Sequence, residues 1–380
     1  MSKNKKLLLA TGGTGGHLFP AQAIAAEVMK NMPGAEVLFA GAGLKQNRYF
    51  EHKEFNYEHV SSMTIFQPNL INIVRCPFLI LQGICQSVKL MRSFKPNLVV
   101  GFGSFHSAPL VIAAKLCRIP LVLFEPNAYP GRVNRWFSRW ARWVAIYFPD
   151  AAKQLKARTY LIKMPFWRGV FERAEEVTRE QSLSYLGLKG DKKTLLIFGG
   201  SQGAASINQW VAEAISELAI DRSELQVIHI TGNADVATNL RNSYSRLNIE
   251  SVVKDFEKNM HLVWPGVDLA VCRAGAGSIA EQINYEVPGV LIPYPHATNN
   301  HQLHNGQFMA ETVKGAKLLT EQDSDATKLK DILQTLLVSS GGHPGEMKDW
   351  LGEMKESIAK YKKISARTSL SSLIMQELEE

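Results

Sequence analysis

The 380-residue sequence is poor in cysteine and contains no long apolar run. Its four cysteines show no C-x-x-C spacing and stand among apolar residues, which predicts buried free thiols in a reducing compartment. No segment approaches the roughly 20 apolar residues that span a bilayer. The apolar run at residues 7–10 is also too short for a signal peptide. These absences argue against a disulfide-rich secreted domain and an integral membrane protein, and we expect a cytosolic chain. The cysteines are Cys76, Cys85, Cys117 and Cys272.

Acidic residues are outnumbered by basic ones, 35 against 43, and the formal net charge is +8. A basic excess favours an anionic partner, such as a nucleic acid, a phosphorylated substrate or a membrane surface. The sequence has no RNA-binding signature and no lysine-rich tail, so we do not expect a nucleic-acid partner.

Short apolar runs alternate with helix-like stretches along most of the chain. This alternation predicts an α/β fold of two Rossmann-like parallel-sheet domains that face each other across a cleft. We expect domains at 1–163 and 164–345, and a helical tail at 346–380 that packs back across the body. The predicted strands are residues 6–10, 37–40, 98–101, 121–124, 143–148, 194–198, 226–231, 252–256, 268–272, 290–293 and 316–319.

A strand that runs directly into T-G-G-T-G-G-H, at residues 11–17, is the most informative local pattern. Four glycines leave the backbone N–H groups free to approach an anion, and a helix that follows adds its positive end. No lysine follows the glycines, which excludes a P-loop. The dinucleotide fingerprint fails because Leu18 occupies its third glycine position. We therefore predict a phosphate cradle, with an ordinary strand-to-helix turn as the alternative.

Two more glycine loops follow predicted strands, at residues 101–104 and 199–204. The first would lie beside the loop at 11–17, so that the two could hold a diphosphate. The second, G-G-S-Q-G-A, also matches the G-x-S-x-G elbow of hydrolases, with Asp268 and His296 following in triad order. That hydrolase reading leaves the first glycine loop without a use, so a second phosphate site is the preferred interpretation.

Other polar residues stand at predicted strand ends. Glu125 and Asn127 would point at the cleft, unless they cap a helix. Glu281, early in a helix, could accept hydrogen bonds from neighbouring sugar hydroxyls, or cap that helix. Residues 293–305 are rich in histidine and amides, which suit neutral hydroxyls; their spacing does not fit zinc. The D-x-D at 323–325 resembles a transferase metal motif, but a surface loop is the simpler reading.

Apolar residues bordered by cations occupy 69–94, and arginines alternate with aromatic residues at 132–143. Such a combination suits the interface of an anionic membrane, although core packing accounts for many of these side chains.

The loops at 11–20, 199–204, 272–281 and 293–305 together resemble the MurG family of UDP-N-acetylglucosamine transferases, in glycosyltransferase family 28. The resemblance covers nearly the whole chain in the same order. It implies a GT-B fold and metal-independent, inverting transfer of N-acetylglucosamine to the C4 hydroxyl of lipid I, which gives lipid II. It also implies no cofactor, and a peripheral location on the cytoplasmic face of the inner membrane. Peptidoglycan synthesis, and with it cell-wall biogenesis, cell shape and cell division, would be the setting.

The resemblance also implies residue roles. His17 would be the general base, and Glu125 would stand with it as a catalytic residue. The acceptor diphosphate would be held by Gly13, Thr14, Gly15, Gly16, Gly103 and Ser104. The donor would contact Thr14, Gly15, Gly16, His17, Asn127, Arg168, Ser201, Gln202, Gly203, Phe256, Glu257, Arg273, Ala276, Gly277, Glu281, His301, Gln302 and Asn305.

Three positions depart from the family pattern. The usual N-P-V-R at the domain junction is M-P-F-W-R here, so that Arg168 is displaced by one position. The tyrosine of the second acceptor loop is Phe105, and E-Q-N is E-P-N. Two alternatives stay open: a related transferase acting on another lipid, and an inactive sugar-nucleotide-binding scaffold.

Overall fold

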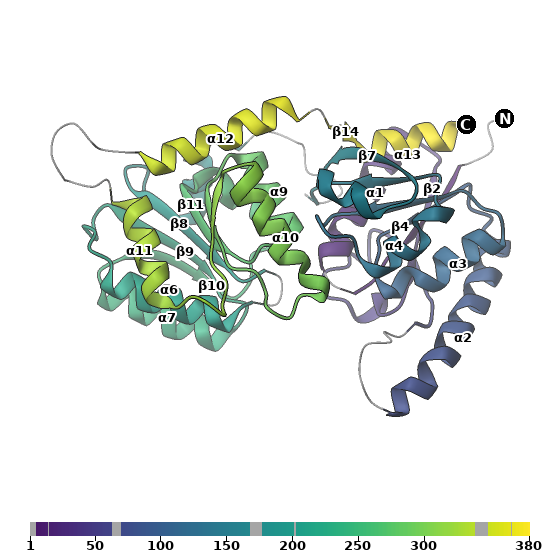
Figure 1. Cartoon of the computed structure of the whole chain (residues 1–380), viewed down its shortest axis with the longest axis horizontal. Helices are drawn as coiled ribbons and strands as arrows, with labels where there is room; N and C mark the ends of the chain where they lie inside the picture. Colours follow the sequence, from purple (N-terminus) through teal and green to yellow (C-terminus); the bar gives the residue numbers. More distant parts are fainter. Residues whose placement is uncertain are drawn as a thin grey trace. The chain divides into compact units, whose positions relative to one another are not determined.

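The computed structural model describes residues 5–13, 15–62, 70–167, 177–200, 203–338, 349–365 and 367–380, without the side chains of 70–75. The chain forms two compact units (Figure 1). Unit 1 comprises Met1–Glu172 and Ala366–Glu380, and unit 2 comprises Arg173–Ser365. The sequence-based ranges were 1–163, 164–345 and 346–380, so the units divide the chain further along and assign its last segment to unit 1.

Unit 1 is built on a parallel sheet that is apolar along its central strands. Strands β1, β4 and β5 are almost entirely buried, as expected for strands covered on both faces. The strands are β1 (Lys6–Ala10), β2 (Glu36–Gly41), β3 (Asn56–His59), β4 (Leu98–Gly101), β5 (Leu121–Glu125), β6 (Trp143–Ile146), β7 (Arg158–Lys163) and β14 (Thr368–Ser369). Within the described residues their order is β14-β7-β6-β5-β4-β1-β2-β3.

Helices connect these parallel strands, as crossover connections require. They are α1 (Gly15–Asn31), α2 (Leu70–Phe94), α3 (Ala108–Leu116) and α4 (Arg132–Phe137), while α13 (Leu370–Glu379) follows the last strand, β14. One side of α1 buries Leu18, Ile24 and Val28, and α2 and α3 pack on each other. Helix α1, which directly follows the first glycine loop, is therefore anchored by its buried side and fixes the end of that loop.

Unit 2 repeats the same architecture with a smaller sheet. Its strands are β8 (Lys193–Phe198), β9 (Leu225–Ile230), β10 (Glu250–Lys254), β11 (Leu269–Cys272), β12 (Gly289–Leu291) and β13 (Ala316–Leu318). Within the described part of the unit the order is β10-β9-β8-β11-β12-β13, with every pair parallel. Its helices are α5 (Arg179–Leu186), α6 (Ala205–Glu217), α7 (Ala234–Arg246), α8 (Met260–Val263), α9 (Ala276–Tyr285), α10 (His301–Gln307), α11 (Ala326–Leu337) and α12 (Trp350–Ile364).

The C-terminal segment divides between the units. Helix α12 packs on α9 and α11, and Lys362 of α12 pairs with Glu286 at 2.9 Å. Helix α13 instead packs on α1 in unit 1, where Ser371 donates a hydrogen bond to Glu27. Strand β14 extends the unit 1 sheet beside β7. Residues 367–380 are therefore an integral part of unit 1.

The α/β class predicted from the sequence is confirmed, and the main errors concern strands at or next to the edges of the unit 1 sheet. β3, β7 and β14 were missed because they are short or polar and lie away from the buried centre of the sheet. The prediction of buried thiols was wrong for two cysteines: Cys85 is exposed and Cys117 is half-buried. Cys85 lies on α2 and Cys117 directly follows α3, and both helices keep one face in solvent.

Candidate active site

The predicted unit 1 residues gather at one edge of the sheet. Strands β1, β4 and β5 are neighbours, with Ala10 level with Gly101 and Gly101 level with Leu123. Since the strands are parallel, the loops that follow them emerge at the same edge. The sequence prediction that the loops at 11–17 and 101–104 lie side by side is therefore confirmed.

The first loop depends on glycine geometry. Gly12 and Gly13 have φ values of 154° and 87°, which favour glycine over residues with side chains. Asn47 braces the loop, because its Nδ2 donates to the carbonyl oxygen of Gly13 at 2.6 Å. Helix α1 then begins at Gly15, so backbone N–H groups of its first turn stand at the strand end. Thr14 lies outside the described residues.

His17 stands in the first turn of α1. Its side chain is half-buried, Gly15 is buried and Gly16 is exposed. The backbone of His17 is tied to the preceding strand, since Thr11 Oγ1 donates to its carbonyl oxygen at 3.4 Å. A histidine at this position can exchange a proton with a ligand held by the loop.

The second loop closes against α4. Gly103 has a φ of 82°, and a Cβ added to it would stand 2.6 Å from Nδ2 of Asn134. Ser104 Oγ is buried and has no hydrogen-bond partner within the described part of the chain. Phe105, where the family has tyrosine, contacts the exposed ring of Trp136 at 6.4 Å between centroids.

Glu125 ends strand β5 and is only 1% exposed. Its Oε1 accepts from the backbone N–H and side-chain amide of Asn127, at 2.9 and 3.2 Å. Its Oε2 accepts from Gly131 N and Asn134 Nδ2, at 2.8 and 2.9 Å. Burial raises the pKa of Glu125, and these hydrogen bonds oppose that rise in part. The donors belong to Asn127, Gly131 and Asn134, so the carboxyl group fixes the loop after β5 and joins it to α4.

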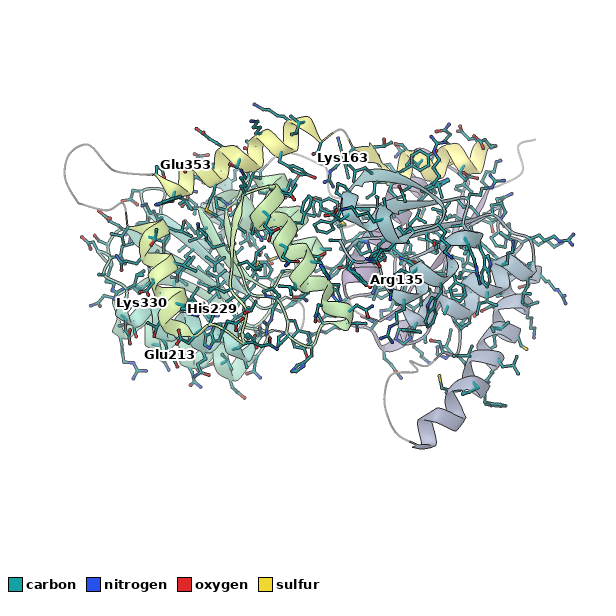
Figure 2. The ribbon with its side chains drawn as sticks, in the orientation of Figure 1. Arg135, Lys163, Glu213, His229, Lys330 and Glu353 are labelled. Atoms are coloured by element: carbon teal, nitrogen blue, oxygen red, sulfur yellow. The ribbon has the colours of Figure 1, made fainter. Side chains whose placement is uncertain are left out.

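Asn134 was missed in the sequence analysis. It is fully buried, and its Nδ2 also donates to the carbonyl oxygen of Phe124 at 2.9 Å. A buried asparagine nine residues after Glu125 carries no distinctive sequence signal, because only the return of α4 to the strand end brings the two together. Arg135, beside it on α4 (Figure 2), donates instead to Tyr129 Oη at 3.0 Å.

In unit 2, the loop after β8 likewise consists of closely packed glycines. Gly200 and Gly203 have φ values of 83° and 73°. A Cβ at Gly199 would overlap Ala204 N at 2.2 Å, and one at Gly203 would approach Thr231 O at 2.7 Å. Helix α6 begins directly afterwards. Ser201 and Gln202, predicted to face a diphosphate, lie outside the described residues.

A buried polar cluster supports this loop from below. Asn208 of α6 donates from Nδ2 to the carbonyl oxygen of Thr231 at 3.0 Å. His229 (Figure 2) links Asn208 Oδ1 and Tyr244 Oη through its two ring nitrogens, at 3.0 and 2.8 Å. Burial lowers the pKa of His229 to about 3. The ring is therefore neutral and structural.

Arg273 follows β11 and is held within its own unit. Its guanidinium pairs with Glu321 at 2.5 Å, and it also donates to Ser206 Oγ at 3.2 Å. Two further hydrogen bonds reach the carbonyl oxygens of Ile292 and Pro293, both at 3.2 Å. Arg273, which follows β11, thus ties the first turn of α6 to the segments that follow β12 and β13. Sequence reasoning missed Glu321, whose position is set only by tertiary packing.

Helix α9 begins at Ala276, which is buried, and Gly277 is exposed at its first turn. Glu281 lies further along α9, and burial raises the pKa of its carboxyl group to about 8. The indole N–H of Trp264 opposes this rise only in part. A neutral carboxylic acid in this helix can lose its proton when a ligand binds, and the carboxylate then accepts hydrogen bonds from ligand hydroxyl groups.

Helix α10 contributes three predicted residues with different surroundings. Asn305 is fully buried, and its Nδ2 donates to the carbonyl oxygen of Ala274 at 3.2 Å. Gln302 accepts from Tyr294 N at 3.0 Å, and His301 Nδ1 lies 2.8 Å from Thr298 O. Burial lowers the pKa of His301 although the Thr298 carbonyl opposes this. Asn305 is therefore part of the scaffold, whereas His301 and Gln302 stand at its surface.

The loop after β10 contains Phe256, which is 42% exposed, and Glu257. Glu257 pairs with Lys254 at 2.6 Å and accepts from Asn259 N at 2.8 Å. Burial alone would raise the pKa of Glu257, but these hydrogen bonds outweigh it and lower the pKa. The Phe256 ring thus stands beside a fixed turn at the strand end.

The hydrolase alternative is contradicted. Asp268 precedes β11, whereas the G-x-S-x-G segment follows β8 from Gly199 onward, and the two strands are parallel neighbours with Leu269 level with Leu195. Asp268 and Gly199 therefore lie at opposite ends of the sheet. Asp268 is instead held by Arg179 at 2.9 Å.

The D-x-D segment has a structural role at its second aspartate, because Asp325 caps α11. Arg168, the displaced junction arginine, lies outside the described residues.

Comparison with known proteins matches both units. Residues 7–146 match the glycosyltransferase family 28 N-terminal domain, and residues 194–360 match the C-terminal domain of the same family. The fold resembles the crystal structure of Acinetobacter baumannii MurG, with a TM-score of 0.74 at 24% identity over 99% of both chains. GT-B architecture is thereby shown.

Curated relatives extend over nearly the whole chain. One, from Protochlamydia amoebophila, is 39% identical over 99% of this chain and 96% of its own length. Another, from Syntrophotalea carbinolica, is 35% identical over 87% of this chain and 90% of its own. Both are named UDP-N-acetylglucosamine–N-acetylmuramyl-(pentapeptide) pyrophosphoryl-undecaprenol N-acetylglucosamine transferase. With these matches, and with its glycine loops at the carboxyl edges of two parallel sheets, the chain belongs to this transferase family, known as MurG, within glycosyltransferase family 28.

Proposed function

We propose that the protein transfers N-acetylglucosamine from UDP-N-acetylglucosamine to the C4 hydroxyl of the muramyl sugar of lipid I, forming lipid II. The observation that carries the proposal is a strand–glycine turn–helix arrangement that occurs in both units. In each unit, glycines with positive φ follow a central strand and precede a helix N-terminus. Two such cradles suit a reaction with two diphosphate-bearing substrates. The family relationship supports the identity of both substrates. The proposed setting is peptidoglycan synthesis, and with it cell-wall biogenesis, cell shape and cell division.

Unit 2 is the proposed donor site. The loop at 199–204, including Ser201 and Gln202, would bind the donor diphosphate together with the N-terminus of α9 at Ala276 and Gly277. Glu281 would accept hydrogen bonds from the ribose hydroxyls. The backbone around Phe256 would contact uracil, and the side chains of His301 and Gln302 would form hydrogen bonds with the N-acetylglucosamine. Support comes from the described glycine turn at Gly200 and Gly203 and from helices α9 and α10, which follow parallel strands of the second sheet.

The proposed role of Arg273 and Asn305 is indirect. Both side chains are buried and engaged within unit 2, Arg273 with Glu321 and Asn305 with Ala274. They would hold the donor loops in place.

Unit 1 is the proposed acceptor site. Its first loop, with Gly103 and Ser104 of the second, would hold the diphosphate of lipid I. His17 would act as the general base that removes the C4 hydroxyl proton. Glu125 would fix the loop that carries Asn127, because its carboxyl group already accepts four hydrogen bonds from that segment.

The proposed chemistry is a single displacement. The C4 oxygen attacks the anomeric carbon while the bond between that carbon and UDP breaks. The hydroxyl proton passes to His17, and UDP leaves with the bonding electrons. Attack from the opposite face inverts the α-linkage of the donor to a β-linkage. Helix N-termini and loop N–H groups would stabilise the departing diphosphate, so the proposal requires no metal or cofactor.

Release of UDP with a short-chain lipid I analogue, measured in EDTA, tests this proposal. Wild-type protein is expected to release UDP only when the acceptor is present, and to give a β-linked disaccharide. His17→Ala should lose about 10²–10⁴ in rate, with its UDP affinity and thermal midpoint unchanged. His59→Ala, at an exposed histidine on β3, is the matched control.

Each alternative predicts a different result. UDP binding without turnover would favour an inactive scaffold. Turnover with another lipid, but not with lipid I, would favour a related transferase. Unchanged turnover in His17→Ala would reject His17 as the base.

We also propose that unit 1 docks on an anionic membrane at the cytoplasmic face of the inner membrane, where a lipid-linked acceptor is available. In the described residues no helix is long and apolar enough to cross a bilayer. Phe78, Leu81 and Leu116 are nevertheless 68%, 60% and 64% exposed on α2 and α3. Apolar side chains of this size suit shallow insertion.

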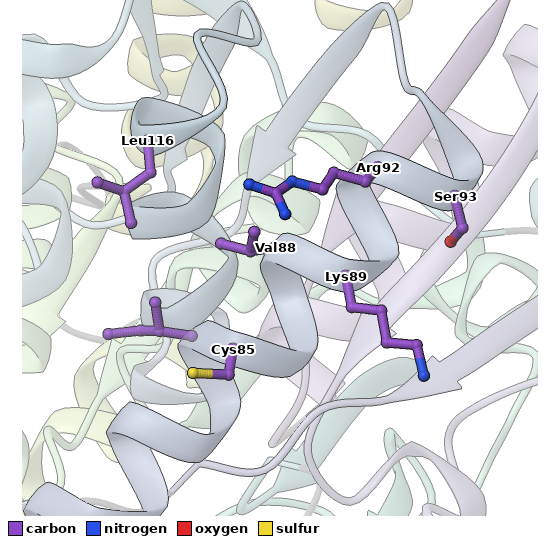
Figure 3. Close-up of a pocket in the computed structure, with 7 residues that line it drawn as sticks. Cys85, Val88, Lys89, Arg92, Ser93 and Leu116 are labelled. Atoms are coloured by element: carbon purple, nitrogen blue, oxygen red, sulfur yellow. The ribbon is translucent and has the colours of Figure 1, made fainter.

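A surface pocket of about 680 Å³ lies between α2 and α3. Figure 3 shows Cys85, Val88 and Arg92 extending from α2 toward Leu116 of α3. Lys89 and Arg92 add positive charge to its largely apolar lining, which suits anionic lipid headgroups. Arg142, one of the arginines at 132–143 that the sequence suggested for membrane contact, instead forms an ion pair with Glu377.

Co-sedimentation with vesicles tests the membrane proposal. Binding to phosphatidylglycerol vesicles should exceed binding to phosphatidylcholine vesicles and fall as salt rises. Phe78→Ser combined with Leu81→Ser should weaken it. Ile364→Ser, at a residue of α12 that is 72% exposed, should not. Equal loss in both variants would reject α2 as the docking surface.

A further inference from the structure

His106 lies directly against the first glycine loop, although sequence reasoning assigned it no role. It follows β4 in the short helical turn Phe105–Ser107. A Cβ added to Gly12 would stand 2.9 Å from the Cβ of His106. One added to Gly13 would stand 3.2 Å from Cδ2 of the imidazole and 3.7 Å from its Nε2. The imidazole therefore occupies the side of the loop that glycine leaves bare.

The orientation of this ring is fixed from its other side. Ser62 Oγ lies 3.0 Å from Nδ1 of His106, and no other hydrogen bond of the ring is present within the described residues. Burial lowers the pKa of His106, so the imidazole is neutral near pH 7. When the Ser62 hydroxyl donates to Nδ1, the ring proton resides on Nε2, the nitrogen nearer to Gly13. An N–H donor then stands beside the backbone N–H groups of the loop.

A second observation points to a ligand at the same place. Ser104, two positions before His106, has a buried hydroxyl that no group among the described residues satisfies. Buried hydroxyl groups in folded proteins nearly always have partners. The turn after β4 thus offers an imidazole N–H and an unsatisfied hydroxyl next to the glycine loop after β1. Both groups can donate to phosphate oxygens.

We infer that His106 is an anion-binding residue of the unit 1 cradle, donating its Nε2 hydrogen to a phosphate oxygen of the acceptor diphosphate. The inference rests on the proposed function for the identity of that anion. Ser62 is then a positioning residue, because it acts only through the orientation of the ring. The alternative is that His106 is a spacer, which fills the volume beside Gly12 and Gly13 without touching a ligand.

Three variants separate binding from packing. His106→Leu keeps most of the volume and removes the donor. His106→Gln keeps an N–H donor on a side chain of similar reach. His59→Ala, at an exposed histidine on β3 of the same unit, is the matched control. Thermal midpoints of all variants establish that the fold is intact.

Kinetics with UDP-N-acetylglucosamine and a short-chain lipid I analogue give the first readout. His106→Leu should raise KM for the acceptor about tenfold, as for loss of one hydrogen bond to a charged group, with KM for the donor unchanged. His106→Gln should recover most of this loss. Unchanged acceptor KM in His106→Leu would overturn the inference. So would equal effects in the Leu and Gln variants, or a parallel change in both KM values.

Calorimetric binding of inorganic pyrophosphate gives a second readout that does not depend on turnover. Wild-type protein should bind pyrophosphate more tightly than His106→Leu by about tenfold, and His59→Ala should match wild type. If no variant transfers sugar to lipid I but this difference persists, the proposed function fails and His106 remains an anion ligand. If transfer occurs and pyrophosphate binding is the same in all variants, the inference about His106 fails alone.

Discussion

Asn134 Nδ2 donates to Glu125 Oε2 at 2.9 Å, and through this contact α4 is fixed to the end of β5. Both side chains are buried, and the same amide also holds the Phe124 carbonyl. The contact joins the E-x-N segment to the second glycine loop, because Gly103 lies against the Asn134 amide. Two loops of the proposed acceptor site therefore depend on one hydrogen-bonded pair.

Glu125→Gln is expected to destabilise unit 1 by about 1–3 kcal/mol. In glutamine an NH₂ group replaces one carboxylate oxygen, and the two N–H groups that donate to that oxygen lose their acceptor. Activity should fall together with stability, whereas UDP affinity should be retained, because the proposed donor site lies in unit 2. Urea denaturation and UDP calorimetry measure the two effects. A variant of normal stability that has lost turnover and one limb of its pH profile would instead make Glu125 a proton carrier.

Gly103→Ala should cost more than backbone strain alone. The added Cβ would meet Asn134 Nδ2 at 2.6 Å at a residue whose φ is 82°. Gly43→Ala is the matched control, because Gly43 has a φ of 75° and open space around it. The control should lose about 1–2 kcal/mol, and Gly103→Ala clearly more, with a higher KM for the acceptor. Equal urea midpoints would show that Asn134 adjusts freely.

Glu281 should make stability depend on pH. Burial raises the pKa of its carboxyl group from 4.5 to about 8, so the folded protein retains a proton that the unfolded chain releases. The associated stability is complete below about pH 4.5 and is lost as pH rises through about 8. Urea midpoints should therefore decline more over this range in wild type than in Glu281→Gln. Parallel profiles would contradict the raised pKa.

The same group should couple UDP binding to pH. If ribose hydroxyls donate to the ionised carboxylate, binding releases a proton and affinity rises as pH increases toward about 8. Glu281→Gln should bind UDP more weakly and lose this dependence. Calorimetry in buffers of different ionisation enthalpy measures the proton release; its absence in wild type would exclude the carboxylate as the ribose acceptor.

Glu321→Gln distinguishes two roles for Arg273. The guanidinium is buried and pairs with Glu321 at 2.5 Å, so removal of that charge should destabilise unit 2 by about 3 kcal/mol. If Arg273 positions the donor loops, UDP affinity should fall as well. A rise in UDP affinity would show that the released guanidinium binds the donor phosphate directly.

The alternation of apolar runs and helices, and the glycine loops that end three of those runs, could be predicted from the sequence. Buried parallel strands such as β1 and β4 need unbroken apolar residues, and turns with positive φ need glycine. Both requirements are local, so both can be recognised in the sequence. Edge strand β3, and β7 next to the short edge strand β14, carry no such pattern, because solvent covers much of their surface.

The sequence by itself thus determined the α/β class and the glycine loops, with His17 directly after the first loop and Glu281 in a helix that follows a strand. Only the tertiary structure decided that Glu125 is held by Asn127, Gly131 and Asn134, that Arg273 is paired with Glu321, and that His106 and Asn134 line the glycine turns. The reason is that hydrogen-bond partners and burial depend on the order of the strands and on where each helix packs. Strand order and helix packing bring together residues that are separated along the chain by irregular intervals, which no periodic sequence pattern reveals.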